Sequence, residues 1–176
     1  MRSIFIIFVL TAFVSILNSC NVSVKKEIKI AKYYDDGKVE SEFFLIDGKK
    51  NGQATLYYNN GQIKQRGNWK DDKQEGIWLF YYENGKLSEK IPFKNDLQDG
   101  WAVFYYPDGS LNQEGNFTKG QPEGISKIYY YGTNKVKDIS NWSNGKRNGE
   151  QTIFDSTGSG VRKYLWKNDE VVRSLK

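Results

Sequence analysis

Histidine is absent from the 176-residue sequence, and cysteine occurs once, as Cys20. A Ser-His or Cys-His catalytic pair therefore cannot form. A zinc site would lack both of its preferred ligand types, and one chain cannot close a disulfide within itself. We expect no catalytic residue, no metal site, no cofactor and no enzymatic activity.

Proline is also scarce, and helical periodicity is missing after Cys20. The chain has 3 Pro against 17 Gly, and 15% of its residues are aromatic. Glycine supplies tight turns, and aromatic residues favour strands. No later stretch repeats its apolar residues with the helical period over about ten residues. The composition predicts an all-β protein.

A block of clustered lysines and arginines is missing as well. The chain has 26 Lys and Arg against 21 Asp and Glu, which gives a formal net charge of +5. The two signs are mostly interleaved. Nucleic-acid binding calls for basic clusters. We therefore expect no nucleic-acid partner, and at most a weak attraction to anionic surfaces.

The long apolar run of the chain lies at the N-terminus, from Ile4 to Leu17. It is too short for a comfortable membrane span of about 20 residues, and it fits the core of a signal peptide. The run ends in Leu17-Asn18-Ser19-Cys20, which resembles the bacterial lipobox. Asn18 is tolerated rather than favoured in that motif. The alternative is a buried free cysteine or an uncleaved anchor helix.

The lipobox resemblance divides the chain into three parts. We expect residues 1–19 to be a cleaved signal peptide, residues 20–27 a lipidated N-terminus with a short linker, and residues 28–176 one domain. Lipid on Cys20 would anchor the protein in a membrane of the bacterial cell envelope, on the periplasmic side or at the surface. The linker spans at most roughly 23 Å, which keeps the domain near the membrane.

A 24-residue repeat occupies the rest of the chain. Pairs of tyrosines begin at positions 33, 57, 81 and 105, and another pair follows at 130 after one inserted residue. Two sets of glycines recur at the same interval, and the last unit is degraded. About five to six units can be recognised. The glycines are Gly37, Gly61, Gly85 and Gly109, and Gly52, Gly76, Gly100 and Gly124.

Each unit contains two turn signals and is therefore predicted to be a β-hairpin. The first signal is an Asp-Gly or Asn-Gly dipeptide, in which glycine takes a positive φ at no steric cost. Pro107 before Asp108-Gly109 indicates a type I turn closed by a glycine bulge. The second turn is expected to be longer, about five residues. Its Gly or Asp positions (such as Asp72 and Gly120) suit a left-handed residue.

The tyrosine pairs, the turn dipeptides and the spaced glycines together resemble the MORN repeat in its bacterial variant form. The resemblance covers roughly residues 33–170. Similar chains are grouped as YwqK-type antitoxin family proteins or MORN-variant repeat proteins. It implies an elongated, single-layer antiparallel β-meander of hairpins. In such a sheet each hairpin is stabilised mainly by its neighbours.

Strand alternation places Trp78, Phe80 and Tyr82 on one face, and Ala102, Phe104 and Tyr106 repeat that face. A single layer has no second layer to cover it, so cross-strand aromatic contacts must hold the sheet together. Gly67 and Gly115 are places where a neighbouring ring could cover bare backbone. The carboxylates of the repeat lie at turn positions, where turn chemistry explains them.

Binding is the function class that remains. We expect a protein partner at an aromatic face centred on Trp78, Phe80, Trp101, Phe104 and Tyr106, because a large exposed apolar patch marks an interaction site. Trp78 and Trp101 lie on opposite faces by parity, so at most one of them belongs to a given surface. The protein would be an envelope-anchored scaffold. The alternatives are a lipid- or glycan-binding module and an antitoxin-like partner of a toxin.

Overall fold

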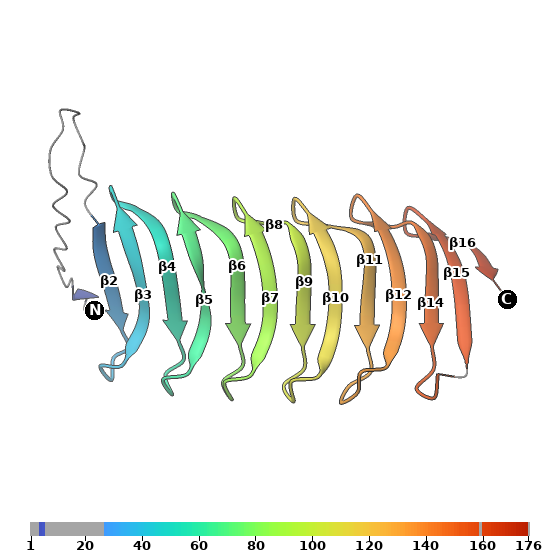
Figure 1. Cartoon of the computed structure of the whole chain (residues 1–176), viewed down its shortest axis with the longest axis horizontal. Coiled ribbons are helices and arrows are strands. Elements are labelled where there is room, and N and C mark those ends of the chain that lie inside the picture. The colour runs from blue at the N-terminus through green and yellow to red at the C-terminus, as the bar shows by residue number, and fades with distance from the viewer. Residues whose placement is uncertain (1–3, 6–26, 159, 176) are drawn as a thin grey trace, which may run out of the picture.

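The computed structural model describes residues 4–5, 27–158 and 160–175, and Cys20 lies outside these ranges. The described residues form one open 16-stranded sheet without a helix, and neighbouring strands are antiparallel. The strands stand side by side along the long axis, in the order of the sequence (Figure 1). The predicted all-β, single-layer meander is confirmed.

Most hairpins pair a strand of seven to nine residues with one of six to nine. The strands are β1 (Ile4–Phe5), β2 (Glu27–Tyr33), β3 (Val39–Ile46), β4 (Lys49–Tyr57), β5 (Ile63–Lys70), β6 (Lys73–Tyr81), β7 (Leu87–Lys94), β8 (Leu97–Gln98), β9 (Gly100–Tyr105), β10 (Leu111–Thr118), β11 (Gln121–Tyr129), β12 (Val136–Ser143), β13 (Lys146–Arg147), β14 (Gly149–Phe154), β15 (Val161–Lys167) and β16 (Glu170–Leu175).

The second turn of each unit is shorter than expected. Only Asp71 and Asp72 separate β5 from β6, and both have positive φ, 50° and 67°. Two consecutive left-handed residues make a type I′ turn, whose twist matches that of the strands. The expected left-handed Gly or Asp is therefore confirmed, whereas the expected length of about five residues is wrong. Asn and Asp tolerate this conformation better than most residues.

The Asp-Gly and Asn-Gly turns are the longer ones. Between β9 and β10 the N–H of Gly109 donates to the carbonyl oxygen of Tyr106 at 2.8 Å, and Gly109 has a φ of 89°. Pro107 and Asp108 keep negative φ. A type I turn followed by a left-handed glycine is the predicted geometry, and it is confirmed here.

The sheet has two faces of different character. Face A is defined by the second residue after each mid-unit glycine, and every member is buried: Ala54, Trp78, Ala102, Ser126 and Gln151. Face B is defined by the first residue after those glycines. It includes the exposed side chains Ile77, Trp101 and Ile125. Alternation along each strand separates the two sets.

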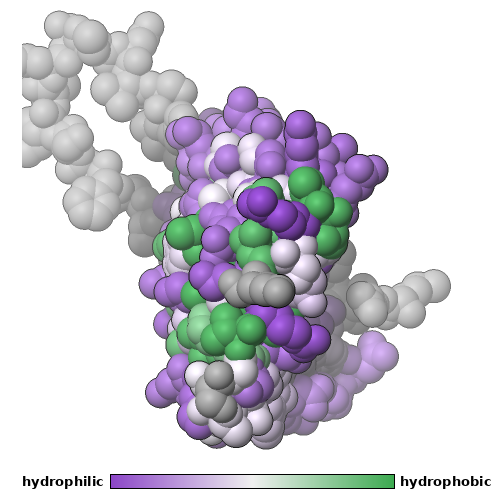
Figure 2. All heavy atoms as spheres, turned by 90° about the vertical axis from the view of Figure 1, so that its right-hand side faces the viewer, coloured by the Kyte–Doolittle hydropathy of each residue, from purple (hydrophilic) through white to green (hydrophobic). Residues whose placement is uncertain are grey.

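The C-terminal end of the sheet is a mixed surface. Seen from that end, hydrophobic patches lie among hydrophilic ones (Figure 2). Val171 and Val172 of β16 are exposed there. At the other end, β1 pairs with β2 and brings Phe5 opposite Ala31. In the described ranges no helix is long and apolar enough to cross a membrane.

Candidate functional site

Trp78 is the best-packed side chain of face A, with 0% exposure. Its ring meets the ring of Trp69 edge to face, with centroids 5.2 Å apart. Its indole N–H donates to the backbone oxygen of Asn68 at 3.1 Å. Gly67 provides the space, because a Cβ atom at that position would overlap the indole. Trp78 therefore holds neighbouring strands together.

The second tyrosine of each pair ties one unit to the next. The hydroxyl of Tyr82 donates to the backbone oxygen of Tyr105 at 2.7 Å, and Tyr58 does the same to Tyr81. Such bonds use carbonyl groups that lie 23 or 24 residues further along the chain. They give the repeat a structural reason for keeping tyrosine. The five donors are Tyr34, Tyr58, Tyr82, Tyr106 and Tyr130. The fifth pair is therefore Tyr129-Tyr130, and the expected start of that pair at Tyr130 is wrong by one residue, because the inserted residue lies in the turn that follows.

At the other ends of the strands, where the two-residue turns lie, carboxylates form hydrogen bonds between successive units. The side chain of Asp96 accepts the N–H of Gln74 at 2.7 Å, and the side chain of Glu123 accepts the N–H of Asn144 at 2.8 Å. These bonds join the turn of one unit to the turn of the next. The turn carboxylates therefore have a structural role, as the sequence indicates. No group of three or more potential metal ligands occurs among the described residues.

Face B carries a row of exposed apolar side chains across the middle of the sheet. Ile77, Trp101 and Ile125 are 46%, 44% and 49% exposed. Pro92 stands between the first two, because Ile77 pairs with Pro92 and Lys90 pairs with Val103 on the next strand. We call these four residues the apolar row. Its three largest side chains are close to half exposed.

Glu114 anchors a polar cluster beside Trp101. Its carboxylate accepts hydrogen bonds from the hydroxyl of Tyr129 at 2.6 Å, from Lys127 Nζ at 3.3 Å and from the indole N–H of Trp101 at 3.3 Å. Burial alone would raise the pKa of Glu114, but these three bonds outweigh it and lower that pKa. Burial of the Tyr129 hydroxyl, its hydrogen bond to Glu114 and the negative charge of Glu114 together raise the pKa of Tyr129 to about 12.

Glu89 on face A is the opposite case. It lies between Phe80 and Phe104 in the strand register. Burial raises the pKa of its carboxyl group. Glutamine occupies the equivalent positions of the units on either side, as Gln65 and Gln113. The negative charge at this one position is thus not required by the repeat.

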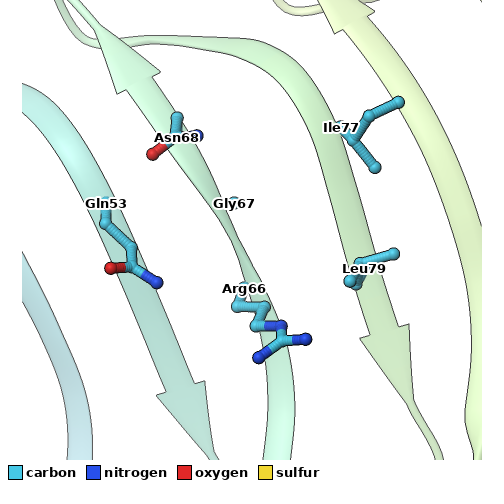
Figure 3. A pocket seen from close by; sticks show the side chains of 6 residues that line it. All are labelled: Gln53, Arg66, Gly67, Asn68, Ile77 and Leu79. Atoms are coloured by element: carbon cyan, nitrogen blue, oxygen red, sulfur yellow. The ribbon is translucent and has the colours of Figure 1, made fainter.

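A hollow of about 370 Å³ lies on face B at the start of the apolar row (Figure 3). Its lining comes from three adjacent strands, β4, β5 and β6. The hollow is lined by two side-chain amides, one guanidinium group and two aliphatic side chains. The lining residues are Gln53, Arg66, Gly67, Asn68, Ile77 and Leu79.

Arg66 supplies the positive charge of the hollow. Its guanidinium carbon lies 5.8 Å from the centroid of the Tyr81 ring. Within the described ranges no carboxylate forms an ion pair with it. Lys90, on the far side of Leu79, is also exposed and without an ion pair in those ranges. This part of face B is therefore positively charged.

The predicted partner face is divided by the structure. Trp78 is wholly buried and cannot reach a partner, which corrects its inclusion in an accessible surface. Phe80 and Phe104 are half-buried on face A, where Tyr106 donates its bond to Tyr129. Trp101 alone of the five lies on face B and is exposed. The opposite parity of the two tryptophans is confirmed.

Sequence reasoning missed Ile77, Ile125 and Pro92 as parts of one surface. A signal was available, because Ile77, Trp101 and Ile125 each follow a mid-unit glycine at the 24-residue interval. The ring expected over Gly67 is confirmed as Trp78. The ring expected over Gly115 is wrong, because Ser126 is the nearest side chain there, 3.0 Å from a Cβ at that position.

Comparison with known families agrees with this geometry. The MORN repeat variant model matches residues 50–71, 74–95 and 98–119. The MORN repeat model matches residues 139–150. The matched segments begin 24 residues apart over the first three units, which is the interval of the tyrosine pairs. No curated protein matches the chain.

Proposed function

We propose that this chain is a non-enzymatic scaffold that binds a protein partner through face B. The family matches support a MORN-repeat protein. MORN repeats commonly serve as interaction modules. The exposure of Trp101, 44% against 0% for Trp78, carries the proposal. An exposed apolar row on a face that no second layer covers favours a binding role.

The proposal includes attachment to the cell envelope through lipid on Cys20. The motif Leu17-Asn18-Ser19-Cys20 supports it. The linker to Glu27 is short, so the N-terminal end of the sheet would lie close to the membrane. A partner would then meet face B within the cell envelope.

Site-specific photo-crosslinking in cells tests the binding face. A photoreactive benzoylphenylalanine at position 101 probes face B, and the same residue at position 93 probes face A, because Phe93 pairs with Gly76 there. We expect a specific crosslinked protein from position 101 and none from position 93. No crosslink from position 101, or equal crosslinks from both, would contradict the proposal.

Stability measurements give the matching control. Trp101→Ala should weaken capture of the crosslinked protein while changing the melting temperature little, because its ring is half exposed. Trp78→Ala should lower the melting temperature strongly, since it empties a buried site. Similar losses of stability for the two variants would mean that Trp101 is structural, and the face B proposal would fail.

A further inference from the structure

The spacing of the apolar row defines the shape of what it can bind. Ile77, Trp101 and Ile125 lie on β6, β9 and β11, each two strands from the next along the sheet. Neighbouring strands are about 4.8 Å apart, so these side chains repeat at roughly 10 Å along the long axis. An α-helix rises about 10.5 Å in seven residues. A helix laid across the strands would therefore present one residue of each heptad to each of Ile77, Trp101 and Ile125.

The width of the surface also fits a helix. Leu79 and Val103 lie two residues along their strands from Ile77 and Trp101, on the same face. Two apolar columns about 7 Å apart match the paired apolar positions of a heptad. A β-strand repeats its side about every 7 Å and would alternate sides over 10 Å. A polyproline helix keeps a suitable period but presents a single ridge.

The charges beside the row indicate the sign of the partner. Arg66 and Lys90 flank Leu79, and neither has an ion pair within the described residues. Further along the sheet towards the C-terminus, Glu114 and Lys127 form an ion pair and neutralise each other. The hollow beside Arg66 also offers the amides of Gln53 and Asn68. A carboxylate entering this hollow would meet a guanidinium and two amide donors.

We propose that face B binds an acidic amphipathic α-helix of the partner protein, lying along the long axis of the sheet. Its heptad-spaced apolar residues cover Ile77, Trp101 and Ile125, and an Asp or Glu enters the hollow beside Arg66. This inference rests on the proposed function of face B. It adds the conformation, direction and charge of the bound segment.

Synthetic peptides of three heptads test the inference with the purified full-length chain in neutral phosphatidylcholine nanodiscs. The first peptide has leucine at the two apolar heptad positions and glutamate elsewhere. A second has the same composition with its leucines at alternate positions of one central stretch, which is the spacing of a strand. A third has lysine in place of glutamate. A proline-rich peptide and vesicles with anionic lipid complete the set, and empty nanodiscs serve as the blank. We expect binding of the first peptide at least tenfold tighter than of any other probe.

Variants connect the binding to the row. Ile77→Glu and Ile125→Glu should each weaken the first peptide at least tenfold, because each places a carboxylate against an acidic helix. The matched control is Val171→Glu, an exposed apolar residue at the end of the sheet, which should bind as the wild type does. Arg66→Gln should weaken the glutamate peptide severalfold and leave a peptide with glutamine in place of glutamate unchanged.

Several outcomes would overturn the helix without touching the proposed function. Equal or tighter binding of the alternating, lysine or proline-rich peptide contradicts the helical or acidic character. Binding to anionic vesicles alone contradicts a protein helix altogether. If position 101 still crosslinks a protein in cells, face B remains the binding face and only the bound conformation is wrong. If that crosslink is also missing, the proposed function fails with it.

Discussion

The indole of Trp78 lies over the bare backbone of Gly67, on the neighbouring strand of face A. A side chain at position 67 would occupy the space that the ring fills. The ring in turn is buried only because that space is open. The two residues form one packing unit, and the exposed row of face B lies on the other side of the same strands.

This packing predicts a strong coupling between the two positions. Gly67→Ala should destabilise the protein by about 1–3 kcal/mol, because the added methyl group overlaps the indole. Trp78→Ala should cost about 3–5 kcal/mol. In the double variant the alanine at position 67 should be nearly neutral. Urea unfolding of the single and double variants measures the coupling, and additive losses would show that the two groups do not compete for space.

The tyrosine ties predict different effects for the two members of a pair. Tyr82→Phe removes the hydrogen bond to the backbone of Tyr105 and should cost about 0.5–1.5 kcal/mol. Tyr81→Phe is the matched control, because its hydroxyl makes no hydrogen bond within the described residues. It should cost less. Equal losses in thermal unfolding would mean that the hydroxyl bond contributes nothing.

The half-buried carboxyl groups of Glu114 and Glu89 are expected to respond in opposite ways to replacement by glutamine. The pKa of Glu114 is lowered from its ordinary value of 4.5, so its contribution to stability is present above that value and is lost as the pH falls through the lowered pKa. The pKa of Glu89 is raised, so its contribution is present below 4.5 and is lost as the pH rises through the raised pKa.

At pH 7, Glu114→Gln should therefore lower the melting temperature and Glu89→Gln should raise it slightly. Both differences from the wild type should shrink on acidification, for Glu89 as the pH falls towards 4.5 and for Glu114 below 4.5. Melting curves across this range check the signs. A loss of stability in Glu89→Gln at pH 7 would contradict the account of face A.

Cys20 leads to a separate prediction about membrane attachment. Cys20→Ser should abolish incorporation of a labelled fatty acid and release the protein from the membrane fraction, because the thiol is the acceptor of the lipid. The control is Ser19→Ala, which keeps a small residue before the cysteine and should be labelled as the wild type is. A wild-type chain that is soluble and retains Met1 would contradict the prediction.

The sequence by itself determined the hairpins and their repetition. Glycine, Asn and Asp decide turn conformation locally, so Asp72 and Gly109 could be assigned positive φ without knowledge of the fold. Two-residue alternation likewise separated Trp78 from Trp101. The order of the strands follows from hairpins joined in series. The turn lengths were not determined, because Asp71-Asp72 is not an obvious type I′ sequence.

Only the tertiary structure decided which tryptophan is buried. Both Trp78 and Trp101 lie in strands of nearly identical pattern, and parity assigns them to different faces without saying which face is covered. The answer depends on Gly67, which lies on an adjacent strand and leaves room for one ring. It depends equally on the hydroxyl ties between units, whose acceptors lie 23 or 24 residues away. Burial is a property of neighbours across the sheet, and the alternation of a single strand does not contain it.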